Sequence, residues 1–355
     1  MRIHIVGAGL IGTSLGLSVA QKGHSVSFED SNKENLRVAN DLIGGEGRDL
    51  DIPIALVVIA TPSEVVFSTL KEQFQKNPES MFIDISGLKS ELIHDVESFS
   101  DLAKRFCGTH PMAGREITGP TAARADLFEG ASWIITPTSQ TEPKILQVIT
   151  ELLVSLGAVV KVVDGESHDR AIASVSHLPQ LLSSLLARTL VNKNVSDLEL
   201  AGQGLRDLTR LADSNPGLWS QLLVRNSKNV SAELVEIRQT IDRILEWLES
   251  NNVAEIEGLL REGNEGKARI PGKHGGKSRE YAYLPIVIDD KPGQLASIFD
   301  ECSKAGVNVE DLFIEHSPGQ QTGLITLALS QDDAVILRSH LVNQNWRVHA
   351  IRAQR

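Results

Sequence analysis

The first twelve residues restrict the possible fold more than any other stretch of the chain. Residues 2–6 have the composition of a buried strand, and they lead directly into Gly-Ala-Gly-Leu-Ile-Gly and then into an apolar helical pattern. In a strand, G-x-G-x-x-G, helix arrangement, the first glycine permits a tight turn, the second lets the backbone approach a pyrophosphate, and the third lets the helix pack on the strand. The sequence therefore predicts a dinucleotide site formed by Gly7, Gly9, Leu10, Ile11 and Gly12.

An acidic residue follows the second predicted strand, residues 25–28, where a dinucleotide-binding domain contacts the adenosine ribose. Asp30 lies eighteen residues after Gly12, and its carboxylate would accept ribose hydrogen bonds and repel a 2′-phosphate. Glu29 is the alternative if the strand is misplaced by one residue, although alternation puts its side chain on the opposite face. NAD is therefore predicted over NADP.

Strand and helix patterns continue to about residue 164. Apolar runs at 54–59, 81–85, 133–136 and 159–163 alternate with helical patterns that include 62–74 and 143–156. Fully apolar strands separated by helices predict an α/β domain, residues 1–164, with a Rossmann-like, doubly wound parallel sheet. Thr61 and Ser86 follow two of these strands and should border the nicotinamide, with a helix N-cap as the alternative role for each.

A glycine-punctuated loop at residues 107–119 contains a histidine and a charged pair. His110 precedes Pro111, so we expect it to be the last extended residue before a turn. Loops at the ends of sheet strands commonly carry the chemistry of α/β proteins. The imidazole of His110 is therefore expected to face the crevice.

Residues 165–262 show helical patterns only. Pro179 interrupts the first helix and should free the carbonyl of Val175 and bend the helix, while His177 and Gln180 share a face. Arg210 lies one helical turn after Arg206. The wide apolar stripe of this all-helical domain predicts a homodimer formed through it.

The remainder of the chain reads as a linker and a third domain. Residues 263–280 contain five glycines and five lysines or arginines, which is typical of a linker. The strand and helix patterns of residues 281–355 follow the order βαββαβ, which predicts a ferredoxin-like domain.

Composition excludes several classes of protein. A net charge of −11 disfavours nucleic acid and anionic membranes as partners. The two cysteines are far apart in sequence and predict neither a disulfide framework nor a metal site. The chain shows neither a run of about 18 apolar residues nor a signal-peptide pattern, so a cytoplasmic location is expected.

Three local signatures carry a resemblance to a known family. The segments His110-Pro-Met-Ala-Gly114, Ser176-His-Leu-Pro179 and Asp207-x-Thr-Arg210, the last followed by Trp219, together resemble the prephenate dehydrogenase family, which includes arogenate dehydrogenases. The tail resembles an ACT domain, a regulatory module for small ligands. The resemblance implies that tyrosine binds there as an inhibitor, near Asp290, Gly293 and Asn308.

The resemblance implies an NAD-dependent oxidative decarboxylation of prephenate to 4-hydroxyphenylpyruvate in tyrosine biosynthesis. His110 would accept the hydroxyl proton, since a neutral imidazole suits that task near pH 7. His177 would hold the substrate ring. Arg210 would bind a carboxylate through its planar fork, and Glu116 would pair with it.

The sequence departs from the family pattern at two positions and leaves alternatives open. Gly87 stands where many members have a serine beside the nicotinamide, and Ser86 replaces that serine only if the turn is rotated. Gln180 stands where many members have a second histidine, which leaves room for the amino group of arogenate. An arogenate dehydrogenase that forms tyrosine directly, and a non-catalytic dinucleotide or tyrosine sensor, are the alternatives. A β-hydroxyacid dehydrogenase would need a catalytic lysine, and only Lys193 lies between residues 165 and 220.

Overall fold

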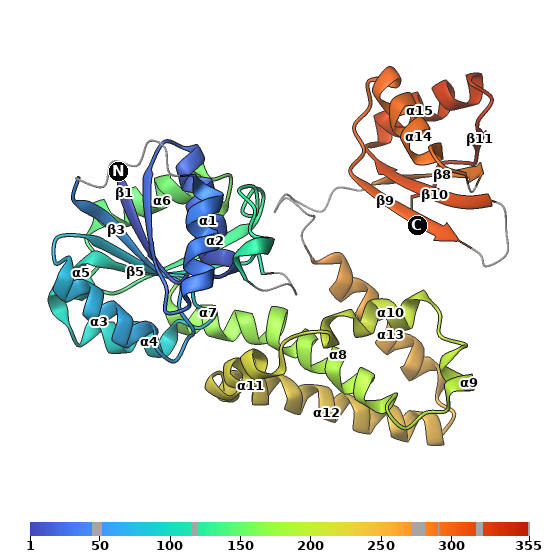
Figure 1. Cartoon of the computed structure of the whole chain (residues 1–355). Helices are drawn as coiled ribbons and strands as arrows, with labels where there is room; N and C mark the ends of the chain where they lie inside the picture. The colour runs from blue at the N-terminus through green and yellow to red at the C-terminus, as the bar shows by residue number, and fades with distance from the viewer. Residues whose placement is uncertain (45–51, 115–118, 271–280, 290, 317–321, 354–355) are drawn as a thin grey trace. The chain divides into compact units, whose positions relative to one another are not determined.

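The computed structural model describes residues 1–44, 52–114, 119–270, 281–289, 291–316 and 322–353. The chain divides into two compact units, Met1–Leu260 and Arg261–Arg355 (Figure 1).

The first unit contains a seven-stranded sheet in the order β2-β1-β3-β4-β5-β6-β7. Its strands are β1 (Arg2–Val6), β2 (Ser25–Glu29), β3 (Ile54–Ile59), β4 (Met81–Asp84), β5 (Phe106–Pro111), β6 (Ser132–Pro137) and β7 (Val159–Val162). The neighbouring strands from β2 to β5 are parallel, which confirms the Rossmann-like prediction. The exception is β6, which runs antiparallel to β5, and β7 is parallel to β6. Parallel neighbours need a long crossover, usually a helix, whereas the described part of the β5–β6 connection contains only the 3₁₀ helix η1 (Pro120–Ala122).

Helices cover both faces of this sheet, which makes it doubly wound (Figure 1). They are α1 (Leu10–Gln21), α2 (Lys33–Ile43), α3 (Val66–Lys76), α4 (Ser90–Glu97), α5 (Ser100–Arg105) and α6 (Pro143–Ser155). In β3, Leu56 and Val58 belong to one buried cluster, whereas Val57 and Ile59 belong to another. Burial on both faces is the reason that this strand is apolar throughout.

The following segments of the first unit are helical. They are α7 (Gly165–Ile172), the π-helix η2 (Ala173–His177), α8 (Leu178–Thr189), α9 (Val195–Leu198), α10 (Gln203–Thr209), η3 (Arg210–Ala212), α11 (Pro216–Arg225), α12 (Ser227–Glu249) and the first half of α13 (Val253–Ala268), which ends in the second unit. The π-helix lies directly before Pro179, where a helix interruption is predicted. Proline has no N–H for the carbonyl four residues earlier, and a wider turn accommodates its ring.

The predicted linker begins too early in the chain. Residues 263–268 belong to α13, which ends at Ala268. Gly263 and Gly266 face open space, and a glycine in an exposed helix costs only about 1 kcal/mol relative to alanine, so the helix continues through them. Residues 271–280 lie outside the described part of the chain.

The second unit contains a four-stranded antiparallel sheet in the order β11-β8-β10-β9. Its elements are β8 (Ala282–Asp289), α14 (Gln294–Ala305), β9 (Asp311–His316), β10 (Thr322–Leu329), α15 (Gln331–Asn343) and β11 (Arg347–Val348). This βαββαβ order, with the third strand between the first two, confirms the ferredoxin-like prediction and is consistent with an ACT-like domain. Apolar side chains of both helices and of the sheet form its core, including Ile286, Ile298, Leu327 and Leu337.

Each unit contains one buried cysteine. Cys107 lies in β5 and Cys302 lies in α14. Burial raises the pKa of the Cys107 thiol to about 12 and also raises that of Cys302. Within the described residues, no helix is long and apolar enough to cross a membrane.

Candidate active site

The glycine loop lies at the carboxyl ends of strands β1 and β3. At this point of the sheet, the connection from β1 leads to β2 on one side, and the connection from β3 leads to β4 on the other side. Gly7 has a φ of +110°, and a Cβ built on it would lie 2.3 Å from the carbonyl oxygen of Ala60. A Cβ on Gly12 would lie 2.1 Å from the carbonyl oxygen of Gly7. No described atom lies within 4 Å of a Cβ built on Gly9, so the loop is tight on its protein side and open on the other. This shape fits a pyrophosphate at the N-terminus of α1.

Asp30 is the acidic residue that reaches the glycine loop. Its carboxylate accepts hydrogen bonds from the backbone N–H groups of Ala8 at 2.6 Å and Asn32 at 2.7 Å. Glu29 instead accepts a hydrogen bond from Gln73 Nε2 at 2.9 Å, at the side of the strand occupied by His4. In the described part of the chain, the buried Oγ1 of Thr61 has no hydrogen-bond partner. An open glycine loop, a carboxylate beside it and an unsatisfied hydroxyl fit a bound dinucleotide, with Leu10 and Ile11 beginning helix α1.

His110 is the first member of a chain of hydrogen bonds that joins the sheet to α7. Its Nδ1 lies 3.0 Å from His168 Nε2, and His168 Nδ1 lies 2.7 Å from Asp169 Oδ1. Asp169 in turn accepts hydrogen bonds from the backbone N–H groups of Lys89 at 2.9 Å and Ser90 at 2.8 Å. Burial alone would raise the pKa of Asp169, but hydrogen bonds from His168, Ser90 and Lys89 lower it, so the group stays ionised.

This chain of hydrogen bonds determines where each neutral imidazole carries its proton. An ionised carboxylate only accepts, so His168 must donate from Nδ1 and accept at Nε2. His110 then donates from Nδ1, which leaves a lone pair on its Nε2. Loss of water around the ring, together with Lys89, His168 and His177 nearby, holds the pKa of His110 well below its usual value. His110 is therefore a neutral proton acceptor at Nε2.

The loop after β4 places a glycine next to that nitrogen atom. A Cβ built on Gly87 would lie 3.9 Å from His110 Nε2 and 3.3 Å from Leu222 Cδ2 of α11. The structure does not bring the hydroxyl of Ser86 to His110. This hydroxyl donates to Asp84 and accepts a hydrogen bond from Lys89 Nζ at 3.0 Å, and so it is part of a buried ion pair between Lys89 and Asp84.

His177 ends the π-helix and is buried, with 2% of its surface exposed. The ring of Trp219 packs against it edge to face, with centroids 5.9 Å apart. Trp219 and Leu222 are three residues apart on α11 and therefore lie on one face of that helix. This face packs on His177 and lies beside Gly87, which is next to His110.

Gln180 does not present its amide N–H groups to a ligand. Its Nε2 donates to the carbonyl oxygen of Leu211 at 2.8 Å and to Ser214 Oγ at 2.7 Å, which ties α8 to the turn that begins with Arg210. Arg210 is exposed at the start of η3. Glu116, its predicted partner, lies outside the described residues.

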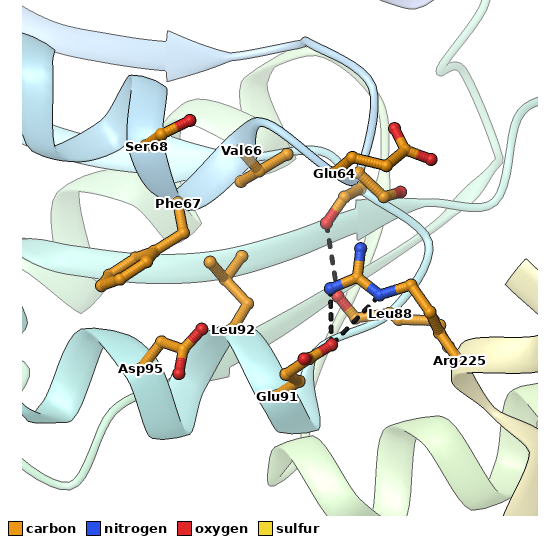
Figure 2. A pocket seen from close by; sticks show the side chains of 11 residues that line it. Glu64, Val66, Phe67, Ser68, Leu88, Glu91, Leu92, Asp95 and Arg225 are labelled. Atoms are coloured by element: carbon orange, nitrogen blue, oxygen red, sulfur yellow. Dashed lines mark hydrogen bonds and ion pairs between the residues drawn. The ribbon is translucent and has the colours of Figure 1, made fainter. Parts of the chain in front are cut away.

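A cavity of about 250 Å³ lies beside this region, lined in part by Ser86 and Leu88 (Figure 2). Arg225, at the end of α11, reaches across it and pairs with Glu91 of α4 at 2.6 Å. This ion pair holds α11 against the sheet domain near Gly87.

Two of the predicted tyrosine ligands, Gly293 and Asn308, lie at opposite ends of a helix. Gly293 directly precedes α14, whereas Asn308 follows it, and a helix of 12 residues is about 18 Å long. The register agrees, because Asp289 pairs near Thr322 and Asp311 pairs near Ala328, at opposite ends of β10. The binding of tyrosine near these residues stays a prediction. Asp290 lies outside the described residues.

Sequence reasoning missed His168, Asp169, Lys89 and Asp84. The sequence does contain a signal for the first two, because a His-Asp pair stands in the first turns of a helix that follows a strand. Their distance from His110 along the chain, 58 residues between the two histidines, hides the contact.

Comparison with known proteins gives consistent results. Residues 15–162 match a family model described as the prephenate dehydrogenase nucleotide-binding domain, and residues 164–262 match one described as its dimerization domain. A probable prephenate dehydrogenase, NovF, from Streptomyces niveus is 29% identical over 353 residues, which are 96% of this chain and 98% of that protein.

Two solved structures are also similar to this chain. One is the A. aeolicus prephenate dehydrogenase in complex with hydroxyphenyl propionate and NAD+, with 28% identity and a TM-score of 0.68 over 75% of this chain and 97% of that one. The other is Synechocystis arogenate dehydrogenase, with 27% identity and a TM-score of 0.65 over 75% of this chain and 99% of that one.

Proposed function

Since the chain belongs to the prephenate dehydrogenase family of NAD-dependent oxidoreductases, we propose that it converts prephenate to 4-hydroxyphenylpyruvate by oxidative decarboxylation. The observation that carries the proposal is the lone pair on His110 Nε2, set by the hydrogen bonds to His168 and Asp169. NAD, when bound, accepts the hydride from the ring carbon that bears the hydroxyl group.

His110 takes the proton of that hydroxyl group as the carbonyl forms. The ring carboxylate leaves as carbon dioxide, and its bonding electrons complete the aromatic ring, so the carbonyl oxygen becomes a phenolate that takes the proton back from His110. The positive charge that His110 gains is stabilised through His168 by the ionised Asp169. Because the pKa of His110 is lowered, the base form is present throughout the neutral range.

We assign substrate binding to two further residues, Arg210 and His177. Arg210 offers a bidentate fork to a carboxylate. Gln180 acts on Arg210 indirectly, because it holds the backbone of the adjacent Leu211. His177, against which the ring of Trp219 packs, contacts the ring of the substrate.

Prephenate rather than arogenate is the proposed substrate. The two family models and the Streptomyces niveus relative are named for prephenate, which supports this choice. Gln180 does not discriminate between the two substrates, because its Nε2 donates to the protein and its Oε1 is an acceptor that an ammonium group can use. Steady-state assays with prephenate and arogenate, each offered with NAD and NADP, test the assignment. A higher kcat/KM for arogenate would replace prephenate with the amino-bearing substrate, and turnover of neither compound would refute the proposed function.

The all-helical domain, residues 165–262, is the proposed homodimer interface. Large apolar side chains are exposed on it, among them Val175, Leu185, Leu208, Val224, Leu245 and Val253. Apolar surface on this scale is typical of an association surface. Sedimentation equilibrium should show a dimer, and a monomer at micromolar concentration would contradict this interface.

Tyrosine inhibition through the second unit is also proposed. The predicted ligand site lies near Asp290, Gly293 and Asn308, and Gly293 has a φ of +89° that favours glycine. A chain ending at residue 278 keeps all of α13 and lacks the sheet of the second unit. It should retain turnover and lose sensitivity to tyrosine, whereas undiminished inhibition would place the inhibitor in the active site instead.

A further inference from the structure

Asn226 lies at the junction of α11 and α12 and is buried, with 4% of its surface exposed. Its Nδ2 donates to the backbone carbonyl oxygen of Asp169 at 2.8 Å and lies 3.1 Å from His177 Nδ1. Its Oδ1 accepts a hydrogen bond from Asn229 Nδ2 at 2.8 Å. One side chain therefore contacts both His177 and the residue that anchors His168 and His110.

Two of these contacts fix the orientation of the amide without reference to His177. A carbonyl oxygen only accepts, so the atom that faces Asp169 must be the nitrogen. The oxygen then faces the amide nitrogen of Asn229, which donates to it. The reverse orientation would set two acceptors against each other at Asp169, and a buried polar group left unpaired costs about 1–3 kcal/mol.

The orientation of the amide decides the tautomer of His177. Nδ2 of Asn226 brings a proton to the imidazole, so His177 Nδ1 accepts and a neutral ring carries its own proton on Nε2. Burial lowers the pKa of His177, with Asp169 acting against this effect and His168 adding to it, so the ring is neutral near pH 7. The Nε2–H group lies on the side of the ring away from Asn226.

We propose that Asn226 is a positioning residue that gives the two active-site histidines opposite hydrogen-bonding roles. Through the amide, His177 becomes a donor at Nε2. Through the carbonyl of Asp169, Asn226 also holds the residue that makes His110 an acceptor at Nε2. A substrate that gives a proton at one end and presents carboxylate or carbonyl oxygens elsewhere needs this combination. The effect on turnover rests on the proposed function, but the tautomer does not.

The Asn226→Asp substitution changes the hydrogen-bonding pattern with almost no change of shape. A carboxylate accepts only, so His177 Nδ1 would have to donate to it. The ring would then lose the Nε2 proton or carry protons on both nitrogens. Asn229→Ala is the matched control, because it removes the contact to Oδ1 and leaves the contact between Asn226 and Asp169 in place.

The test is ¹⁵N NMR of the full-length protein labelled at its histidines, with the signal of His177 assigned by its loss in His177→Gln. Wild type and Asn229→Ala should both show a neutral ring protonated at Nε2 near pH 7.5. Asn226→Asp should show protonation at Nδ1, either alone or together with Nε2. A wild-type ring protonated at Nδ1, or an unchanged tautomer in Asn226→Asp, would overturn the proposal. The wild-type spectrum decides the first point even if the variant does not fold.

Kinetics then connects the tautomer to substrate binding. If His177 in Asn226→Asp has lost its Nε2 proton, KM for prephenate should rise about 10- to 150-fold, which corresponds to the loss of one hydrogen bond to a charged group. If the ring carries protons on both nitrogens, the donor is kept and KM should stay near the wild-type value. Asn229→Ala should leave KM near the wild-type value. Loss of the Nε2 proton with an unchanged KM would refute the role in binding, whereas a wild-type enzyme inactive on prephenate and arogenate would refute the proposed function and leave the tautomer result intact.

Discussion

Asp169→Asn should inactivate the enzyme without unfolding it. The two carboxylate oxygens accept three hydrogen bonds, from His168 and Lys89 at Oδ1 and from Ser90 at Oδ2. An amide has one acceptor atom and one donor atom, so at one of these positions a donor must face a donor. If the NH₂ group faces His168, the protons of both imidazoles move, and His110 carries its proton on Nε2 where the base is needed. If it faces Ser90, the tautomers stay as they are, but the negative charge that stabilises protonated His110 is lost.

The size of the effect follows from these contacts. One buried N–H left without an acceptor costs about 1–3 kcal/mol, and replacing a charged acceptor by a neutral one removes about 1 kcal/mol more. The loss of about 2–4 kcal/mol is smaller than the 5–15 kcal/mol by which domains are usually stable, so the variant should fold. Loss of a positioned general base should lower kcat about 10²- to 10⁴-fold.

The measurements are NADH formation at saturating substrate and urea unfolding. Asp164→Asn is the matched control, since Asp164 caps the N-terminus of α7 through Ser167 at 2.8 Å and is exposed. It should keep wild-type kcat. If Asp169→Asn lost the expected stability and kept wild-type kcat, the hydrogen bonds from His110 to Asp169 would have no part in the proton transfer.

Four further predictions follow from the site. His110→Asn should lower kcat about 10²- to 10⁴-fold with little change in KM, and a near-normal kcat would make His110 structural. Arg210→Ala should act mainly on KM, by about one to two decades, because a charge-assisted hydrogen bond contributes about 1.5–3 kcal/mol; a fall in kcat alone would place Arg210 in the transition state. Asp30→Ser should narrow the preference for NAD over NADP in kcat/KM, and an unchanged ratio would remove Asp30 from cofactor selection. The free energy of unfolding should fall as pH falls below about 6.5, since burial lowers the folded-state pKa of His110 and His177 and the unfolded chain then binds more protons. Urea unfolding from pH 5 to 7.5 should show a shallower fall in His110→Asn, and equal slopes would contradict the lowered pKa.

Local patterns in the sequence predict the cofactor region because its residues are close along the chain. The glycine loop needs only a strand, a turn and a helix, and Asp30 is one strand away. The interruption before Pro179 is local for the same reason, since proline acts on the turn that precedes it.

Contacts between distant segments could not be predicted in this way. The pairing of His110 with His168 depends on where α7 lies against the sheet, which periodicity does not encode. The described residues between β5 and β6 contain no crossover helix that would make the two strands parallel, and an apolar strand has the same pattern in either direction.

The distribution of the cysteines gives each unit its own chemical reporter. Cys107 is three residues from His110, and Cys302 is in the helix that separates Gly293 from Asn308. Only a thiolate reacts readily with an alkylating reagent, and burial raises the pKa of both thiols, so modification requires opening of the surrounding structure. Mass spectrometry of the two cysteine peptides after timed alkylation would therefore give the opening free energy of each unit separately. A ligand that stabilises only one unit would slow alkylation at only one cysteine.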